Sequence, residues 1–358
     1  MTGYILRRIA LMVPTLFGIL AIAFIIVQFA PGGPMETMVA KLRGDDVAGT
    51  SRIGGEAGGQ LGDESLSRGS QGVPPQIIEE LKERFGFDKP WYERFGIMVW
   101  NFVRFDFGES YFKHERVIDS IGDAAKVSLS LALWTKLLVY LIAIPLGIAK
   151  AVREGSRFDL ASSGVIILGY AIPNFLFAVL LLVLFAGGSF WSIFPFKGIV
   201  SSGWAELPWY QQILDYLWHM VLPVLSLAVS GFATVTFLTK NSFLDEIRKQ
   251  YVITARAKGL NERKVLYGHV FRNAMLIVIA SFPASFLLLF FTGSILIEHI
   301  FSLDGMGLLG FNALINRDYP TVFALIYMFS LIGIVVHLLT DLLYTWIDPR
   351  IDFESREV

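Results

Sequence analysis

The residues with the most specific arrangement form a short run in which small side chains alternate with cations. The run consists of Thr254, Ala255, Arg256, Ala257, Lys258, Gly259 and Leu260. Small side chains let another protein approach the backbone closely. This pattern favours noncovalent docking of a partner.

Sequence motifs that would indicate catalysis are absent. The chain has no G-x-x-x-x-G-K-[ST] phosphate loop, no H-E-x-x-H and no G-x-S-x-G, so any ATP must be hydrolysed by another chain. Gly305, Gly307 and Gly310 fit G-x-G-x-x-G, but the fingerprint needs a βαβ unit and here lies in a loop between two apolar runs, so we reject dinucleotide binding. Without cysteine, the chain has no thiolate nucleophile, disulfide framework or cysteine-bound metal.

Residues 240–273 must position the docking candidate. They hold eight Lys or Arg and three acidic residues, and they separate two apolar runs that are each long enough to cross a bilayer. Residues at helical spacing predict one helix, capped by Ser242 and ended by Gly259: Leu244, Ile247, Tyr251 and Ala255. Asn261 can cap a second, short helix with one apolar side: Val265, Leu266, Val270 and Phe271. We therefore expect a helix, a sharp turn and a helix at the cytoplasmic surface.

Two interpretations of this charged stretch remain open on physical grounds. It can be a basic amphipathic loop that rests on anionic lipid headgroups. It can also be a docking surface, which the small residues at Ala255, Ala257 and Gly259 favour.

The composition indicates a membrane protein. Among 358 residues, 54% are hydrophobic and 17% are charged, and the mean hydropathy is +0.58; ordinary soluble domains carry about 25% charged residues. The first apolar run, residues 9–30, exceeds the roughly 7–15 residues of a signal-peptide core and suits a hydrocarbon layer of ~30 Å. Five further spans are predicted at residues 127–149, 158–185, 217–239, 274–297 and 322–346.

Charge asymmetry predicts the orientation. With the N-terminus inside, the inner side receives most of the basic residues outside the long 31–126 segment, whereas the two short outer loops receive only Lys197 and Arg317. The inner set, beside the charged stretch, is Arg7, Arg8, Lys150, Arg153, Arg157, Arg350 and Arg356. We expect both termini in the cytoplasm, with a first helix in 1–30, a periplasmic segment in 31–126, a membrane core in 127–346 and a tail in 347–358.

The periplasmic segment divides into two parts. Residues 44–73 are rich in glycine and nearly free of bulky apolar residues, which predicts an insert without fixed structure. Beyond them, residues 77–85 and 91–105 each fit a short amphipathic helix. Their aromatic residues can pack as a small cap over the spans, or they can contact a delivered substrate or its binding protein.

The run TARAKGLNERKVLYGHVFRNA, residues 254–274, resembles the EAA loop of permease subunits of binding-protein-dependent ABC importers, in its dipeptide and oligopeptide form. Gly259 matches the hallmark glycine and Ala255 the last alanine of the triplet, while Ile253 and Thr254 depart from its first two positions. Similar peptide-permease signatures match D-F-G-x-S at 106–110, R-D-x-P at 317–320 and D-P-R at 348–350. The resemblance covers nearly the whole chain.

The resemblance implies an all-α membrane protein with the six transmembrane helices of the type I ABC importer permease fold. It implies a coupling loop at residues 254–260, a second homologous permease, a cytoplasmic ATPase that binds ATP and magnesium, and a periplasmic solute-binding protein. The chain itself would hold no cofactor or metal and bind no nucleic acid. The closest subgroup imports oligopeptides and also admits microcin C-like antibiotics. An ion-driven secondary peptide transporter is the alternative, and it predicts acidic residues near mid-membrane.

Overall fold

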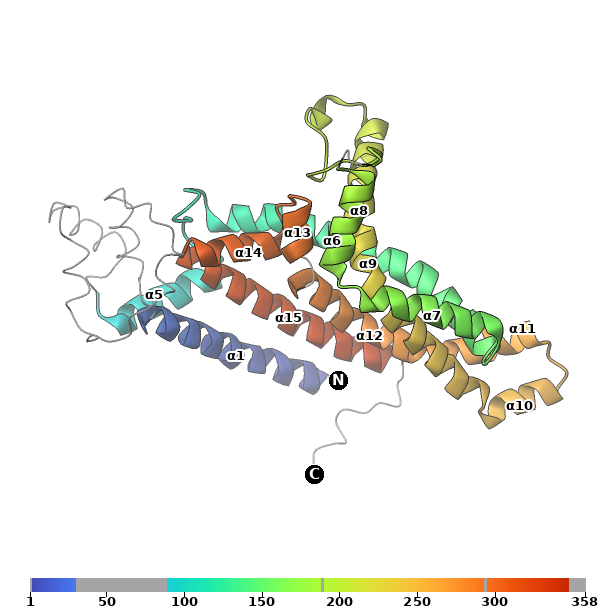
Figure 1. The fold of residues 1–358 in the computed structure, drawn as a ribbon. Coiled ribbons are helices and arrows are strands. Elements are labelled where there is room, and N and C mark those ends of the chain that lie inside the picture. Colours follow the sequence, from blue (N-terminus) through green and yellow to red (C-terminus); the bar gives the residue numbers. More distant parts are fainter. Residues whose placement is uncertain (1, 30–88, 188–189, 293–294, 348–358) are drawn as a thin grey trace, which may run out of the picture. The chain divides into compact units, whose positions relative to one another are not determined.

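The computed structural model describes residues 2–29, 89–187, 190–292 and 295–347, and these ranges contain helices and turns but no strand beyond one isolated bridge (Figure 1). The predicted all-α class is confirmed. The expected insert at 44–73, the expected helix at 77–85 and the tail after residue 347 lie outside the described residues. The expected helix near 91–105 is observed as α5 (Trp91–Val103).

Each of the six predicted spans corresponds to helix. Five helices are long and apolar enough to cross a membrane: α1 (Thr2–Phe29), α6 (Val117–Val152), α9 (Trp209–Ile247), α12 (Phe271–Thr292) and α15 (Tyr319–Ile347). The candidate span that contains α12 begins earlier, at Glu262. The sixth region consists of α7 (Arg157–Ala171) and α8 (Asn174–Phe185). Shorter elements are a 3₁₀ turn (Trp204–Glu206), α10 (Gln250–Ala257), α11 (Glu262–Val265), a π turn (Leu266–Val270), α13 (Ile295–Ile300) and α14 (Met306–Ile315).

The predicted span over residues 158–185 is sharply bent in the structure. α7 and α8 meet at an angle of 93°. The cause is Pro173, whose ring pushes the preceding residue out of the helical region; Ile172 accordingly has φ −82° and ψ 121°. Pro223 and Pro283 lie inside continuous helices, α9 and α12. Proline alone therefore did not predict where a span breaks.

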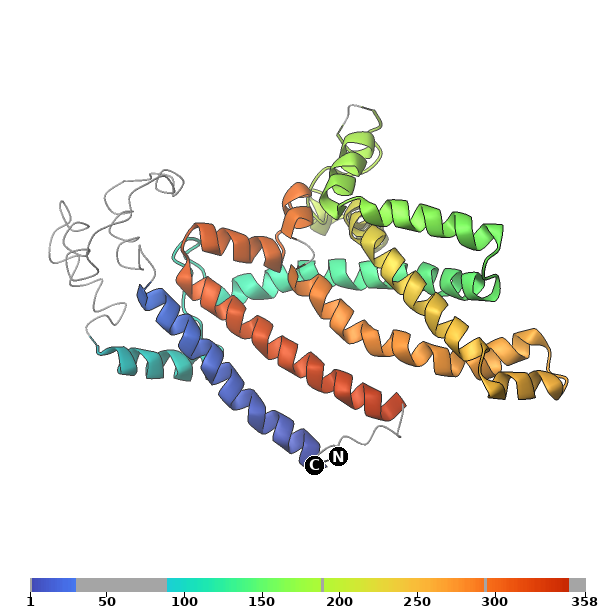
Figure 2. The same cartoon turned by 60° about the horizontal axis from the view of Figure 1, so that its bottom comes forward.

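Contacts divide the chain into two compact units. The first comprises Asp123–Leu309 and Gly333–Val358. One of its apolar cores joins α6, α8, α9 and α13 through residues such as Leu131, Leu181, Leu227 and Phe301. Another joins the later parts of α6 and α9 to α10, α11 and α12 (Figure 2). The second core lies directly under the charged stretch.

Gly147 lets α6 and α9 pack closely within the first unit. A Cβ at this position would lie 2.7 Å from the Cβ of Thr239 and 2.8 Å from the carbonyl oxygen of Thr236. Small residues allow such close backbone approach between membrane helices. A larger side chain at residue 147 would have to push the two helices apart.

The second unit comprises Thr2–Gly122 and Gly310–Ile332, and it brings two sequence signatures together. Asp318, from R-D-x-P, is buried and accepts hydrogen bonds from Ser110 Oγ at 2.6 Å, the Tyr111 backbone N–H at 2.9 Å and Thr321 Oγ1 at 2.7 Å. Burial, together with the charge of Asp318, raises the pKa of Tyr111 to about 12. The two signatures, about 200 residues apart in sequence, thus form one interlock.

Candidate functional site

The charged stretch begins inside α9. This helix continues to Ile247 rather than starting anew at Ser242, so the predicted N-cap role of Ser242 is wrong. The buried Ser242 hydroxyl instead donates to the carbonyl oxygen of Ala274 on α12, at 2.6 Å. The prediction of one helix from Ser242 to Gly259 is also wrong, because the chain turns between Arg248 and the extended Lys249, where α10 begins without a side-chain cap.

Gly259 ends α10 as the sequence predicted. Its φ is +80°, and the backbone forms the two hydrogen bonds of a Schellman motif. The Leu260 N–H donates to the Ala255 oxygen at 3.4 Å, and the Gly259 N–H donates to the Arg256 oxygen at 2.9 Å. Leu260 and Ala255 also share the apolar core beneath, which completes the motif. The turn therefore requires glycine for its backbone conformation.

The second predicted helix is confirmed in outline. Asn261 caps α11, since its Oδ1 accepts from the Lys264 N–H at 2.8 Å. Val265 and Val270 are buried, and Leu266 and Phe271 pack beside them. A π turn then leads into α12.

The seven candidate residues divide between two sides of the turn. Ala255 is 7% exposed and packs into the core with the fully buried Val252, so its small side chain serves internal packing and not the approach of a partner. Leu260 is half-buried. The exposed members, hereafter the turn face, are Thr254, Arg256, Ala257, Lys258 and Gly259. Ile253 adds an exposed apolar side chain next to them.

The two cations of the turn face differ in their contacts. Arg256 forms a bidentate pair with Glu262 on α11, with N–O distances of 2.9 and 3.1 Å, and thereby joins the two helices. Such an exposed pair contributes at most about 1 kcal/mol. The Lys258 backbone N–H donates to the Thr254 oxygen at 3.1 Å, but its side-chain ammonium makes no hydrogen bond or ion pair with any part of the chain that the structure describes. A Cβ on Gly259 would meet nothing within 4 Å, so the backbone there is open to an approaching surface.

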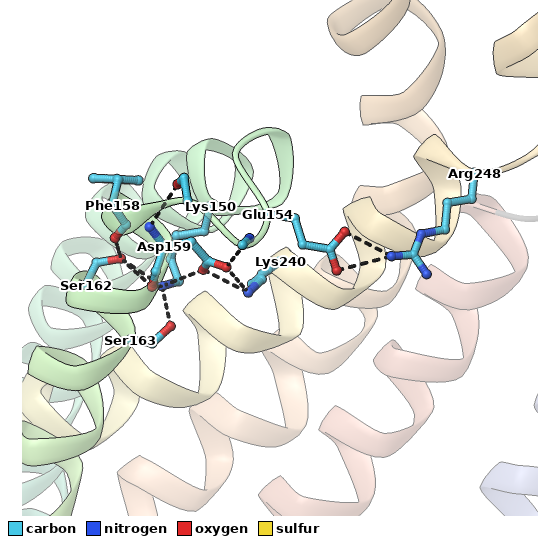
Figure 3. Close-up of polar contacts among 10 residues, drawn as sticks. Lys150, Glu154, Phe158, Asp159, Ser162, Ser163, Lys240 and Arg248 are labelled. Carbon is cyan, nitrogen blue, oxygen red and sulfur yellow. Dashed lines mark hydrogen bonds and ion pairs between the residues drawn. The ribbon is translucent and has the colours of Figure 1, made fainter.

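A buried ion network joins the last turns of α6, the first turn of α7 and α9 (Figure 3). The fully buried Lys150 ammonium lies 3.1 Å from the Asp159 carboxylate and donates to the Asp159 carbonyl, Ser162 and Ser163 at 2.7–2.8 Å. Lys240 donates to both Asp159 carboxylate oxygens, at 2.8 and 2.7 Å. We call Lys150, Asp159 and Lys240 the basal triad.

The basal triad fixes the part of α9 that carries the turn. Lys240 precedes the end of α9 at Ile247 by seven residues, or about 10 Å of helix. Beyond it, Arg248 pairs with Glu154 at 2.9 Å (Figure 3). Tyr251 donates to Glu246 at 2.7 Å, and burial together with this bond raises the pKa of Tyr251. The turn face thus rests on an apolar core and on polar links to α6 and α7.

Sequence reasoning missed the basal triad, because it used Lys150 and Lys240 only as charges on the inner side. A local signal did exist. Ser156 and Asp159 have the spacing of a capping box, and the Ser156 hydroxyl does accept from the Asp159 N–H at 3.2 Å. That signal places Asp159 in the first turn of α7, but it does not reveal the two lysines.

The G-x-G-x-x-G run serves packing around a buried carboxylate. A Cβ on Gly305 would lie 2.2 Å from Glu298 Oε1. Glu298 is fully buried and accepts from Ser128 Oγ at 2.9 Å and from the Leu308 N–H at 2.7 Å. The run itself lies in the turn after α13 and in the first part of α14.

Comparison with known proteins agrees with this architecture. Residues 143–353 match the family described as "Binding-protein-dependent transport system inner membrane component". The chain is 60% identical to the "Peptidoglycan transport system permease protein YejB" of Agrobacterium fabrum, over 100% of both chains. It is 53% identical to the "Inner membrane ABC transporter permease protein YejB" of Escherichia coli O157:H7, covering 99% of this chain and 100% of that one.

A more distant relative extends the pattern. The chain is 31% identical to the "Oligopeptide transport system permease protein AppB" of Bacillus subtilis, over 99% of this chain and 100% of the relative. The family match covers more than half of the sequence, and the full-length relatives are permeases. The chain therefore belongs to the binding-protein-dependent transport system inner membrane component family, as a multi-pass inner-membrane permease with the all-helical type I fold.

Proposed function

We propose that this chain is the permease subunit of an ABC importer for short peptides, and that the turn face docks the importer's ATPase. The observation that carries the docking proposal is the construction of the turn. Its underside, with Val252 and Ala255, is packed into the core, while Lys258 and the Gly259 backbone remain open. Such a preformed surface loses little freedom when a partner binds.

The docking interpretation fits the observed contacts better than the lipid interpretation. A helix that rests on lipid presents a continuous apolar face to the membrane. In α10 the apolar residues Val252 and Ala255 are buried in the protein core. Among the described residues of α10, Ile253 is the one large apolar side chain that is exposed. Basic and small residues dominate the outer side, which suits a protein surface.

The proposed complex contains three kinds of partner chain. A second homologous permease completes the translocation pathway, a cytoplasmic ATPase binds ATP and magnesium and hydrolyses the ATP, and a periplasmic binding protein delivers the substrate. This permease is not itself an enzyme. Alternating access between the two permeases moves the substrate. Both termini and the turn face lie in the cytoplasm, in the orientation that the basic residues favour.

Short peptides are the substrate chemistry that the relatives' names share. The relatives are named for oligopeptide and peptidoglycan transport, and peptidoglycan contains short peptide stems. We therefore infer a site that accepts a peptide backbone with varied attached groups. Peptide–nucleotide antibiotics of the microcin C type fall within this class.

The function is tested by reconstituting the complete transporter in liposomes with ATP available to the ATPase. Labelled tripeptide should accumulate when the loaded binding protein is present, and a peptidoglycan stem peptide should compete with it. Uptake should persist when ionophores remove every ion gradient, because ATP supplies the energy. Uptake that needs a gradient and ignores ATP would favour the secondary-transporter alternative. A failure of any peptide to enter or compete would contradict the substrate class.

A further inference from the structure

α5 lies beside a membrane span rather than in open water. Its Phe95 ring contacts two rings of α1, with centroid distances of 5.3 Å to Phe17 and 5.4 Å to Phe24. Figures 1 and 2 both show α5 next to α1. The depth of α5 in the membrane is therefore set by the depth of the part of α1 that it contacts.

That part of α1 lies within the hydrocarbon layer. The apolar window of α1 covers Leu6–Ile26, and its 21 residues extend about 30 Å, the thickness of a hydrocarbon core. Phe24 is about 3 Å and Phe17 about 13 Å from the Ile26 end of this window. Phe95 is thus below the membrane surface, whichever way the chain is oriented.

The opposite side of α5 has the residues of a membrane boundary. Tyr92, Ile97, Trp100 and Val103 are between 44% and 59% exposed. Of the exposed charges, Glu93 lies in the first turn of α5 and Arg104 lies just beyond its last residue, and the Arg104 guanidinium lies 4.3 Å from the centre of the Trp100 ring. Trp and Tyr collect at the membrane–water boundary, and long cationic side chains reach from there toward water.

We propose that α5 is an in-plane membrane helix, with Tyr92, Ile97, Trp100 and Val103 set against lipid. The middle of this face is uncharged, which is favourable in lipid and unfavourable in water. The buried side of α5 fits the same arrangement, since Phe102 packs on Phe107 and Tyr327 at ring distances of 4.9 and 5.5 Å. The helix therefore lies along the membrane boundary. It is not part of a cap surrounded by water.

The absence of native cysteine allows a direct test in the complete transporter. Ile97→Cys and, separately, Val103→Cys carry a nitroxide label in liposomes, and collisions with oxygen and with a water-soluble nickel chelate are measured. Lys113→Cys, in the exposed loop after α5, is the aqueous control, and Leu11→Cys, exposed on α1, is the lipid control.

Labels at residues 97 and 103 should collide with oxygen several-fold more often than with nickel, as at residue 11, whereas residue 113 should show the reverse. Nickel collisions at 97 and 103 that match those at 113 would place α5 in water and overturn the proposal. Low collision rates with both reagents would also overturn it, because they would indicate a face buried against another protein. Two labelled positions guard against a single variant that fails to fold.

Discussion

Replacing Gly259 with valine is expected to reduce uptake about tenfold or more, while the spans still insert. Gly259 has φ +80°, and a left-handed backbone costs roughly 1–2 kcal/mol for a residue with a Cβ, which is about a tenfold change in an equilibrium. Valine also places two methyl groups in the open space on the turn face. ATPase binding should therefore weaken, or ATP hydrolysis should cease to respond to the loaded binding protein.

A second positive-φ glycine supplies a matched control. Gly203, in the loop between α8 and α9, has φ +79°, and a Cβ there would also meet nothing within 4 Å. Gly203→Val introduces similar backbone strain away from both the turn face and the basal triad, so uptake per inserted transporter should remain near that of the wild type. Gly259→Asn separates two causes, because asparagine tolerates the left-handed conformation but still adds bulk.

The lipid interpretation predicts a different result for the same variants. A neutral change at Gly259 would barely alter contact with headgroups, whereas the loss of Arg256 and Lys258 would weaken it. Normal uptake in Gly259→Val, or an equal loss in Gly203→Val, would contradict the docking account.

Replacing Asp159 with alanine is expected to destabilise the first unit by about 3–5 kcal/mol, the usual effect of leaving buried charge unpaired. Two cations lose their counter-ion, since Lys150 is fully buried and the Lys240 side chain is 15% exposed. The change should be measured as a lower temperature of inactivation of the purified transporter. The transport rate per folded transporter should also fall, because Lys240 no longer holds the later part of α9 against α7.

An exposed ion pair nearby provides the control for Asp159. Glu154 and Arg248 have side chains that are 48% and 68% exposed, so Glu154→Ala should cost less than about 1 kcal/mol. Adding Lys240→Met to Asp159→Ala should recover part of the stability, because one unpaired cation is removed. Equal effects of Asp159→Ala and Glu154→Ala would show that the basal triad contributes little.

Local sequence signals were sufficient to predict the membrane-spanning helices and the turn at Gly259. Apolar runs of about 20 residues have few alternatives to membrane helix, which is why all six predicted regions are helical. Gly259 and Asn261 were placed correctly because a left-handed end and a side-chain cap depend on a few adjacent residues.

Features that depend on distant contacts could not be predicted in the same way. Ser242 has the chemistry of a cap, but Ala274, 32 residues away, takes its hydrogen bond, and α9 continues through it. Ala255 was assigned to the partner surface because its burial depends on how α10 packs against α11 and α12. Asp159 and Lys240 are 81 residues apart, so no spacing rule pairs them.

The hydrogen bond of Ser110 with Asp318 and the buried carboxylate of Glu298 show the same limit. The D-F-G-x-S and R-D-x-P signatures were visible in the sequence, but the hydrogen bond that joins Ser110 to Asp318 spans about 200 residues. The hydrogen bond that joins Ser128 to Glu298 spans 170 residues. Only the fold shows what each of these residues touches.

The most direct test of the account is whether Lys258 contacts the ATPase. In the assembled transporter, Lys258→Cys can carry a photoactivatable cross-linker, with Lys197→Cys in the predicted outer loop as the control. The account predicts a permease–ATPase product from residue 258 that is lost when Gly259→Val is added, and no such product from residue 197. Cross-links from residue 258 that reach only lipid, or an ATPase product formed equally from residue 197, would contradict the assignment of the turn face.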